Sequence, residues 1–496
     1  MKKIKCLLLV IVLVVASVSV YQPAYSKANF TVNKKALKKM AKKTYHSHAN
    51  KYTNDYLGLN SYLEKMRKKG GGTLTIKKGT YKICNAICVP SNVTIIFKSG
   101  VKFIKTSKTG IKGQKAASGM WQIVPKKKSM KKNSVKGYKG SKNVKLIAQG
   151  KVTFDMKKKY GMCIACAHND GVEISGITFK GMNGDHYIEV NGSRNVNIHN
   201  NYFGAAVAKT KKKNYNKEAI NVDTPDAKTH GIPLKWVKKD LTPCVNVTIQ
   251  NNTFNGTTRG VGTHKYSQKG GKHVYHQNVK VIHNAFNNIY DNGVFVLNWQ
   301  NATIQNNSFN TIGKSSNLSY SSGSHGISGG GIQGITIKGN SFTNIKRNAI
   351  YFGVQKNVKA GSSYGKTKIS ITEAQYRAMV ENKSSKCGNE YNKKYKGYDF
   401  VIFKGNGERN EKNVVAAKFG VKSIYCGDGT QIVWPVPPTT TIAPTQQPTR
   451  PTPTEQPTRP APNEETTASA IQFPTNEPES TINSLFDPQS GGSIDN

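Results

Sequence analysis

The sequence of 496 residues contains 74 Lys and Arg against 26 Asp and Glu, which gives a formal net charge of +48. A surface this basic attracts polyanions. The lysines are scattered and lack the motifs of nucleic-acid recognition, so the composition argues against a nucleic-acid partner and favours an anionic polysaccharide.

Residues 1–26 have the pattern of a secretory signal peptide. Lysines near the N-terminus precede an apolar run from residue 7 to residue 15 and a stretch of small residues, and this run is too short to span a bilayer. We therefore expect a secreted protein, extracellular or associated with the cell wall. Seven cysteines follow this segment. An odd number cannot pair completely, and we expect buried thiols.

Residues 27–70 are expected to form an N-terminal helical cap. Apolar residues recur at helical spacing between residues 33 and 69, and the glycines at 70–72 end the run. Such a cap would cover the end strand of a sheet, whose backbone groups are otherwise unpaired.

A short phrase recurs through the middle of the chain. It reads NVNIHNNYF at 195–203, NVTIQNNTF at 246–254, NVKVIHNAF at 278–286, NATIQNNSF at 301–309 and GITIKGNSF at 334–342, with a divergent GVEISGITF at 171–179. Each copy alternates β-branched and polar residues as a strand does, and it cannot bury its apolar face alone. The spacing varies from roughly 23 to 51 residues, unlike helical repeats of fixed length. The Asn residues suit left-handed bends, so we predict an all-β fold, a right-handed parallel β-helix.

The remaining boundaries follow from composition. Residues 71–434 are expected to form the β-helix catalytic domain, with a long loop at 105–143 and a C-terminal cap region that contains a helix near 372–382. Residues 435–496 are rich in Pro and Thr and contain QPTRP twice. We expect them to be a disordered linker or tail, through which the protein could associate with a cell wall. We expect a monomer.

The repeats resemble the pectate lyase and polygalacturonase superfamily, as do GGGTLTIKKGTYKI at 70–83 and SNVTIIFKSGVKF at 91–103. The resemblance extends over residues 50–353. It implies a right-handed parallel β-helix and cleavage of an acidic, uronate-containing, pectin-like polysaccharide. It is more specific for the fold than for the reaction, because one scaffold hosts many chemistries.

One apolar residue per coil aligns the strands of the central region. These anchors are Ile164, Ile188, Ile220, Val261, Val294, Ile327 and Ile350. In this register Glu189 and Asn191 face outward from one coil, and Asn221 and Asp223 face outward from the next. His264 faces outward from the third, and neighbouring coils lie about 4.8 Å apart.

Other candidates lie at the strand entrances and in the connecting loops. The residues two positions before the anchors stack at the entrances and include His186, Glu218, Arg259 and His325. The longest connections frame the same coils, and functional residues often lie on such loops. The residues expected to bind substrate are His186, Asn191, Asn221, Trp236, Lys265, Tyr266 and His325. Their aromatic rings could stack on sugars, and the lysine could pair with carboxylates.

Hydrolysis of a glycosidic bond needs two carboxyl groups, and Glu189 and Asp223 are the predicted acid and base. Strand spacings place their α-carbons about 8 Å apart, within the roughly 6.5–9.5 Å carboxyl separation of inverting enzymes. Glu218 and His264 would orient the site, and Arg259 would hold a substrate carboxylate or sulfate. We expect Asp223 to face solvent, so that its replacement abolishes cleavage without unfolding the chain. This hydrolase requires no metal or other cofactor.

Short motifs qualify the resemblance to polygalacturonases. The segment N-V-D at 221–223 is similar to their N-x-D element, and H-G-I-S at 325–328 is similar to their H-G-L-S segment. The next coil has G-T-H at 262–264, where an Asp pair is expected, and no R-I-K follows. The motifs therefore argue against hydrolysis of polygalacturonate itself, even though the fold is expected to be the same as in polygalacturonases.

Three other functions stay open beside the slightly favoured hydrolase. Resemblance to β-helix polysaccharide lyases implies elimination by basic catalysts beside Ca²⁺, and Arg259 and Lys265 could be those catalysts. Glu189, Asn221 and Asp223 would then offer the oxygen ligands that Ca²⁺ prefers. The other two functions are a non-catalytic polysaccharide-binding surface adhesin and a polymer epimerase.

Overall fold

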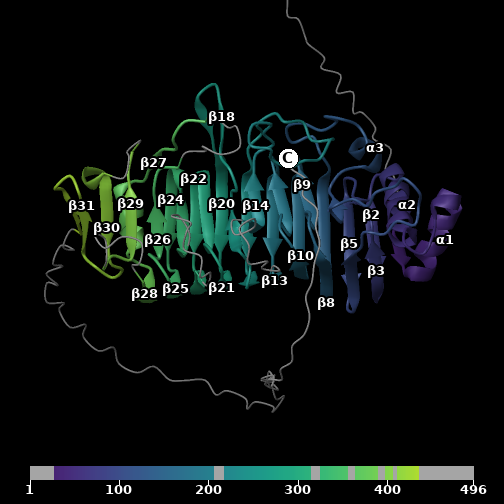
Figure 1. The fold of residues 1–496 in the computed structure, drawn as a ribbon, viewed down its shortest axis with the longest axis horizontal. Helices are drawn as coiled ribbons and strands as arrows, with labels where there is room; N and C mark the ends of the chain where they lie inside the picture. The colour runs from purple at the N-terminus through teal and green to yellow at the C-terminus, as the bar shows by residue number, and fades with distance from the viewer. Residues whose placement is uncertain are drawn as a thin grey trace, which may run out of the picture. The chain divides into compact units, whose positions relative to one another are not determined.

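The computed structural model describes residues 27–205, 217–313, 324–355, 364–388, 397–405 and 410–434. The expected signal peptide at 1–26 and the expected tail at 435–496 lie outside these ranges and stay predictions. Within the ranges the chain coils into a parallel β-helix that has helices at one end and antiparallel strands at the other (Figure 1). In this described part no helix is long and apolar enough to cross a bilayer.

The helical end confirms the expected cap. Its elements are β1 (Phe30–Val32), α1 (Lys34–Tyr45), the 3₁₀ turn η1 (His46–His48) and α2 (Asn54–Lys68). The side chain of Asn33 caps α1 by accepting a hydrogen bond from the N–H of Ala36 at 2.9 Å. The two α-helices cross closely at Gly58, where a Cβ would lie 2.5 Å from the carbonyl oxygen of Leu37. Strand β1 pairs with β2 and so joins the cap to the first coil.

Three rows of parallel strands form the walls of the β-helix. The first row contains β2 (Gly72–Ile76), β5 (Val93–Lys98), β8 (Lys142–Lys159), β10 (Asp170–Met182), β12 (Arg194–His199), β15 (Val245–Gln250), β20 (His276–Ile282), β22 (Val294–Gln305), β24 (Ile327–Lys338) and β27 (Ile369–Ser370). The second row contains β3 (Gly79–Ile83), β6 (Val101–Lys105), β13 (Tyr202–Phe203), β16 (Thr253–Asn255), β21 (Ala285–Ile289), β23 (Ser308–Ile312), β25 (Ser341–Ile345) and β28 (Lys383–Cys387), together with the later parts of β8 and β10. The third row contains β4 (Ile87–Cys88), β7 (Trp121–Gln122), β9 (Ile164–Ala167), β11 (Ile188–Asn191), β14 (Glu218–Asp223), β17 (Arg259–Gly262), β26 (Ile350–Phe352) and β29 (Phe400–Phe403), together with the first parts of β22 and β24.

The register of the third row is the one predicted from the anchors. Ile188 pairs with Ile164 on one side and with Ile220 on the other. The same alignment continues through Val261, Val294, Ile327 and Ile350. These anchors are fully buried in the core, so the alternate residues of each strand face the outside of the sheet.

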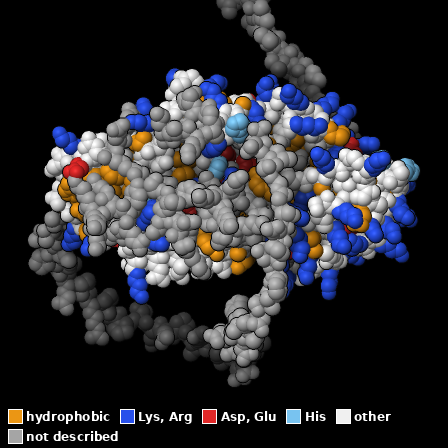
Figure 2. Space-filling model, in the orientation of Figure 1, with side chains coloured by type: hydrophobic (Ala, Val, Ile, Leu, Met, Phe, Trp, Pro, Cys, Tyr) orange, Lys and Arg blue, Asp and Glu red, His pale blue; other side chains and the backbone are white. Residues whose placement is uncertain are grey.

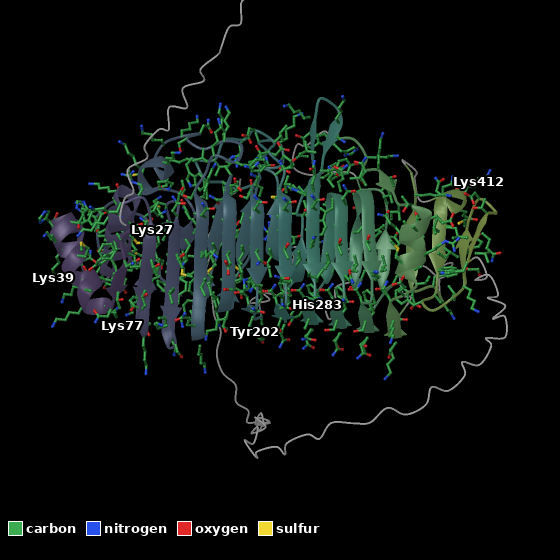
Figure 3. The ribbon with its side chains drawn as sticks, turned by 180° about the vertical axis from the view of Figure 1, so that it is seen from behind. Lys27, Lys39, Lys77, Tyr202, His283 and Lys412 are labelled. Carbon is green, nitrogen blue, oxygen red and sulfur yellow. The ribbon has the colours of Figure 1, made fainter. Side chains whose placement is uncertain are left out.

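Two ladders of identical side chains hold the coils in register. Buried Asn side chains bond from coil to coil at 2.8–3.0 Å, each Nδ2 donating to the Oδ1 of the next, along Asn201, Asn252, Asn284, Asn307, Asn340 and Asn382. Rings stack at centroid distances of 4.7–4.9 Å along Phe179, Phe203, Phe254, Phe286, Phe309 and Phe342. The residue before each ring faces out, as Tyr202 does in Figure 3. The repeated phrase thus encodes one inward aromatic and one buried amide per coil.

The connections carry the remaining elements. They include the short helix α3 (Lys126–Ser129), the hairpin of β18 (Ser267–Lys269) and β19 (Lys272–Val274), and the helix α4 (Glu373–Met379). The C-terminal end adds η3 (Glu411–Asn413) and the antiparallel strands β30 (Val414–Ala417), β31 (Ser423–Cys426) and β32 (Gln431–Val433). All seven cysteines in the described ranges are free thiols, buried except for the half-buried Cys387, as predicted.

Candidate functional site

The outward residues of β11 and β14 and of the turn after β17 meet on the third row of strands. Glu189 lies beside Asn221, and Asn191 lies beside Asp223, because the inward anchors of these strands pair directly. His264 follows β17 on the next coil, and its backbone N–H donates to the Oδ1 of Asn221 at 3.0 Å. The sequence register therefore brings these side chains together as predicted.

The expected exposure of Asp223 is wrong. Asp223 is 4% exposed and Glu189 is 2% exposed. The loop after β14, residues 224–244, folds back over the outward face of the strands. Its residues Trp236 and Val237 belong to a small apolar cluster with Met162 and with Ala165 and Ala167 of β9. The carboxyl groups thus lie outside the β-helix core but under a loop.

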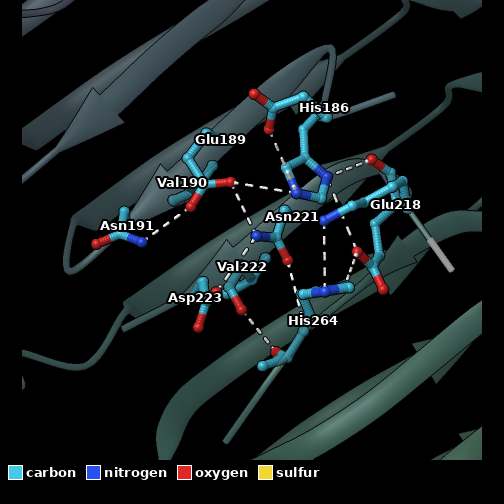
Figure 4. A network of polar contacts seen from close by, with 12 residues as sticks. His186, Glu189, Val190, Asn191, Glu218, Asn221, Val222, Asp223 and His264 are labelled. Carbon is cyan, nitrogen blue, oxygen red and sulfur yellow. Dashed lines mark hydrogen bonds and ion pairs between the residues drawn. The ribbon is translucent and has the colours of Figure 1, made fainter. Parts of the chain in front are cut away.

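An amide links the two carboxyl groups (Figure 4). The Nδ2 of Asn221 donates to Glu189 Oε2 at 2.8 Å and lies 3.5 Å from Asp223 Oδ2. These two oxygens can therefore be no further apart than the sum of the two distances, about 6.3 Å. The other Glu189 oxygen accepts from Asn191 Nδ2 at 2.8 Å, and Asp223 Oδ1 accepts from the backbone N–H of Thr224 at 2.7 Å. Hydrogen bonds thus fix the orientation of both carboxyl groups.

Burial changes the proton affinity of this pair. It raises the pKa of Glu189 well above its usual range, and the nearby charge of Asp223 raises it further. Burial also raises the pKa of Asp223 to about 7, against the hydrogen bond from Thr224 and together with the charge of Glu218. Two carboxylates so close in a dry site cannot both ionise easily. The pair therefore retains a proton near neutral pH.

A third carboxyl group, that of Glu218, is ionised and orients His264. Burial alone would raise the pKa of Glu218, but the hydrogen bond and charge of His264 and the charge of Arg259 hold it well below its usual range. His264 Nδ1 lies 3.5 Å from Glu218 Oε2, and His264 Nε2 lies 3.4 Å from the Nζ of Lys217. Glu218 thus turns the other edge of the imidazole toward Lys217.

His186 is neutral and faces the carboxyl pair. Burial lowers the pKa of His186 to about 3, and the charges of Lys217 and His264 contribute. Its Nδ1 lies 2.7 Å from the carbonyl oxygen of Glu218, so Nδ1 carries the proton and donates. The other ring nitrogen, Nε2, is therefore an acceptor, 3.8 Å from Glu189 Oε2. A neutral His186 can therefore accept a hydrogen bond at Nε2 from a donor that lies between this nitrogen and Glu189.

Most of these side chains, although not Asn191 or Glu218, line one pocket. It has a volume of about 120 Å³, smaller than the roughly 300–1,000 Å³ of most ligand pockets. The lining residues are Tyr160, Met162, Asp185, His186, Glu189, Lys217, Asn221, Asp223, Thr229, His230, Gly231, Ile232, Pro233 and His264. Figure 2 shows acidic and histidine side chains together near the middle of this face. The pocket is therefore too small to enclose a long stretch of polymer.

Arg259 does not line this pocket, which corrects its expected contact with a substrate anion. The Arg259 side chain is buried, and its Nε and Nη1 donate to Asp291 at 2.5 Å and to Glu218 at 2.9 Å. Its guanidinium also lies 4.0 Å from the centre of the Phe295 ring. Arg259 therefore holds Glu218 in place from behind.

Other candidates for substrate binding are also enclosed. Trp236 is 1% exposed and donates from Nε1 to Gln122 Oε1 at 2.9 Å, so it has no free face for a sugar. Tyr266 is 1% exposed and bonds to the carbonyl of Gly365 at 2.8 Å. His325 is buried against the Tyr351 ring, four coils from β11. These loop and entrance residues serve structure, because tertiary contacts cover them.

Two further predicted residues lie beside the pocket without lining it. Lys265 is half-buried, and its Nζ donates to the carbonyl of Thr229 at 3.2 Å. Asn191 is fully buried and acts by holding Glu189. Both stabilise the walls of the site.

The sequence reasoning missed Asp185 and Lys217, which do line the pocket. Each stands three positions before an anchor, Ile188 and Ile220 respectively, and so directly before the entrance residues already singled out. Burial raises the pKa of Asp185 to about 6, and the charge of Lys217 opposes that rise. Extending the aligned row by one position would have identified both.

The donor set around the carboxyl pair does not suit calcium. The amide of Asn221 presents its NH₂ group to Glu189 and Asp223, and its oxygen accepts from the backbone of His264. Asn191 likewise presents NH₂ to Glu189. Calcium needs six to eight oxygen ligands, whereas these neighbours are hydrogen-bond donors.

Comparison with known proteins identifies the class of fold. A family model described as "Right handed beta helix region" matches residues 139–309. The chain is a right-handed parallel β-helix protein, as the repeats predict.

The chain is also similar to named proteins. It is 30% identical over 165 residues to "Plasmin and fibronectin-binding protein A" of Streptococcus pneumoniae, a match that covers 32% of this chain and 22% of that protein's length. A solved structure of PfbA, a surface adhesin of S. pneumoniae, has 17% identity and a TM-score of 0.45 and covers 67% of this chain and 80% of that one. An exopolygalacturonase from Thermotoga maritima has 12% identity and a TM-score of 0.43, with coverage of 69% and 79%.

Proposed function

We propose that the chain is a secreted carbohydrate-active enzyme that hydrolyses an acidic polysaccharide in the pocket over β11 and β14. One observation carries this proposal: Glu189 and Asp223 share the amide of Asn221 at the pocket wall, and the pKa of both is raised. Such a pair keeps one proton to donate and one charge to accept a proton near neutral pH.

The more strongly perturbed residue suits the acid role. In the proposed reaction Glu189 gives its proton to the glycosidic oxygen as the bond to the anomeric carbon breaks. Asp223, with a pKa near 7, takes a proton from the water that attacks this carbon. After the reaction Asp223 is protonated and Glu189 is ionised. Proton exchange with solvent then returns the proton to Glu189 and restores the starting state.

The predicted inverting outcome stays a prediction. Retaining enzymes hold their carboxyl groups about 5–5.5 Å apart, and inverting enzymes hold them about 6.5–9.5 Å apart. The distance between Glu189 Oε2 and Asp223 Oδ2 is at most about 6.3 Å, which is below the inverting range. The anomeric configuration of the released sugar distinguishes a retaining from an inverting enzyme.

The cations at the pocket suit an acidic sugar. Lys217 lines the wall beside His264 and could pair with a uronate carboxylate. The formal charge of +48 would raise the local concentration of such a polymer.

The test is product formation by the full chain on a panel of acidic polysaccharides. New reducing ends without unsaturated uronates support hydrolysis, whereas unsaturated uronates that require Ca²⁺ would indicate a lyase. The variants Glu189→Gln and Asp223→Asn should abolish product. The matched control is Asp226→Asn, because Asp226 is also buried but bonds to Ser267 and Tyr364 outside the pocket. Equal product from Asp223→Asn and the parent would refute the mechanism.

A polysaccharide-binding surface protein is the second candidate. It draws support from the relative whose name describes plasmin and fibronectin binding, although the match covers 22% of that protein. This alternative predicts glycan binding with no product from any glycan, and no difference between Asp223→Asn and the parent.

A further inference from the structure

A second, larger groove lies near the helical end of the β-helix. It has a volume of about 500 Å³ and lies between the end of α2, the turn at Ser91 and Asn92, and the segment 125–134. It shares no lining residue with the pocket over β11 and β14. Its volume is within the range of about 300–1,000 Å³ that is usual for ligand sites.

The charge of this groove is positive. It is lined by Arg67, Lys127, Lys128 and Lys131 and by no acidic residue. Arg67 is paired with Glu64 at 2.7 Å, but no ion pair occurs for the three lysines among the described residues. All three lysines are exposed, and Figure 2 shows basic side chains crowded over the end that carries the helices. Three positive charges are thus available to a ligand.

The uncharged residues that line the groove favour an acidic glycan over a nucleic acid. Ser91, Asn92 and Ser134 supply hydroxyl and amide groups, which suit sugar hydroxyls. No aromatic residue lines the groove, so bases of a single-stranded nucleic acid would have no ring to stack on. The combination of lysines with small polar residues favours an acidic glycan.

The lysine segment is held in shape before any ligand binds. Ser134 Oγ donates to the carbonyl of Lys128 at 2.7 Å. The backbone N–H groups of Asn133 and Val135 donate to the loop 224–244, at Lys235 and Trp236, over 2.8 and 3.1 Å. Binding would therefore require little ordering of backbone, which lowers its entropic cost.

We propose that this groove binds an anionic polysaccharide through Lys127, Lys128 and Lys131, as a second glycan site distinct from the cleavage pocket. The two sites are connected through the loop 224–244, which braces the groove at one end and lines the pocket with residues 229–233. This inference does not depend on catalysis, since a non-enzymatic binding protein could use the same groove.

The test measures binding in the full chain that carries Asp223→Asn, so that cleavage cannot affect the result. The probes are polygalacturonate and dextran sulfate, which separate carboxylate from sulfate ligands, and neutral dextran. The groove variant adds Lys127→Glu, Lys128→Glu and Lys131→Glu. The three substitutions replace exposed ion pairs with like-charge repulsion, so we expect affinity for the anionic glycans to fall about 10-fold or more.

The matched control changes three exposed lysines of α1, Lys38, Lys39 and Lys42, to Glu, which alters the net charge equally outside the groove. We expect this control to keep its affinity within about twofold, because charges beyond a Debye length of about 8 Å are screened. Melting temperatures would verify that both variants are folded. An equal loss in the control would attribute binding to net charge alone and overturn the proposal, as would an unchanged affinity in the groove variant.

Discussion

Replacing Asp223 with Asn should change how the stability of the protein depends on pH. Burial raises the pKa of Asp223 from 3.8 to about 7. Each pKa unit corresponds to about 1.4 kcal/mol, so the ionised form costs about 4 kcal/mol more in the folded state than in the unfolded chain. Between about pH 4 and pH 7 the folded state retains a proton that the unfolded chain has lost. This contribution to stability is therefore present in acid and is lost as the pH rises through that window.

Asp223→Asn removes this titration. The free energy of unfolding of the variant, relative to the parent, should rise by up to about 4 kcal/mol between pH 4 and pH 8. Denaturant unfolding at pH 4, 6 and 8 measures it. A relative stability that stays constant over this range would show that Asp223 is not a dry carboxyl group, and it would remove the base from the proposed mechanism.

The variant Asp240→Asn is a control in which the change of stability with pH should have the opposite sign. Burial alone would raise the pKa of Asp240, but hydrogen bonds from Thr242 and from the N–H of Gly137 lower it below 3.8. The stability contributed by Asp240 is present above its unfolded pKa and is lost as the pH falls. The free energy of unfolding of this variant should therefore fall furthest below that of the parent at neutral pH, and the difference between them should become smaller in acid.

The remaining predictions concern activity and the groups behind the pocket. As the pH increases, the rate of cleavage should rise with an apparent pKa near 7 as Asp223 ionises. At higher pH the rate should fall as Glu189 loses its proton. Initial rates that stay constant from acid to alkaline pH would contradict the assignment of Glu189 as acid and Asp223 as base. Arg259→Gln should cost about 3–5 kcal/mol in denaturant unfolding, because Glu218 and Asp291 stay buried without their cation, and a loss below about 1 kcal/mol would contradict this buried network. EDTA should leave cleavage unchanged, because hydrogen-bond donors face the carboxyl pair, and a loss that Ca²⁺ restores would contradict this.

The alignment of the strands could be predicted from the sequence because it depends on local patterns. Each coil repeats one inward apolar anchor, and a slip by one residue would turn Glu189 and Asn221 into the core. Such a slip would bury charge against apolar side chains, so the register is strongly determined. The pairing of Ile188 with Ile220 follows directly.

The enclosure of the site could not be predicted in the same way. Val237 pairs with Val135 in an isolated bridge across about a hundred residues of chain, and the segment around Trp236 carries no periodic pattern. Sequence spacing alone therefore suggested a loop that exposes its aromatic ring. The partner of Arg259 was missed for a similar reason, since Asp291 lies one position outside the entrance row that we aligned.

The strands and the loop contribute different properties to the carboxyl pair. On the strands alone, Glu189 and Asp223 would face water, and their proton affinity would be close to that of free carboxylic acids. The loop 224–244 excludes that water, and burial is the largest cause of both raised pKa values. Lys239 fastens the loop by donating to the carbonyls of Gly231 and Ile232. The repeat thus sets the spacing of the acid and the base, and an insertion between two repeats sets the pH at which they can exchange a proton.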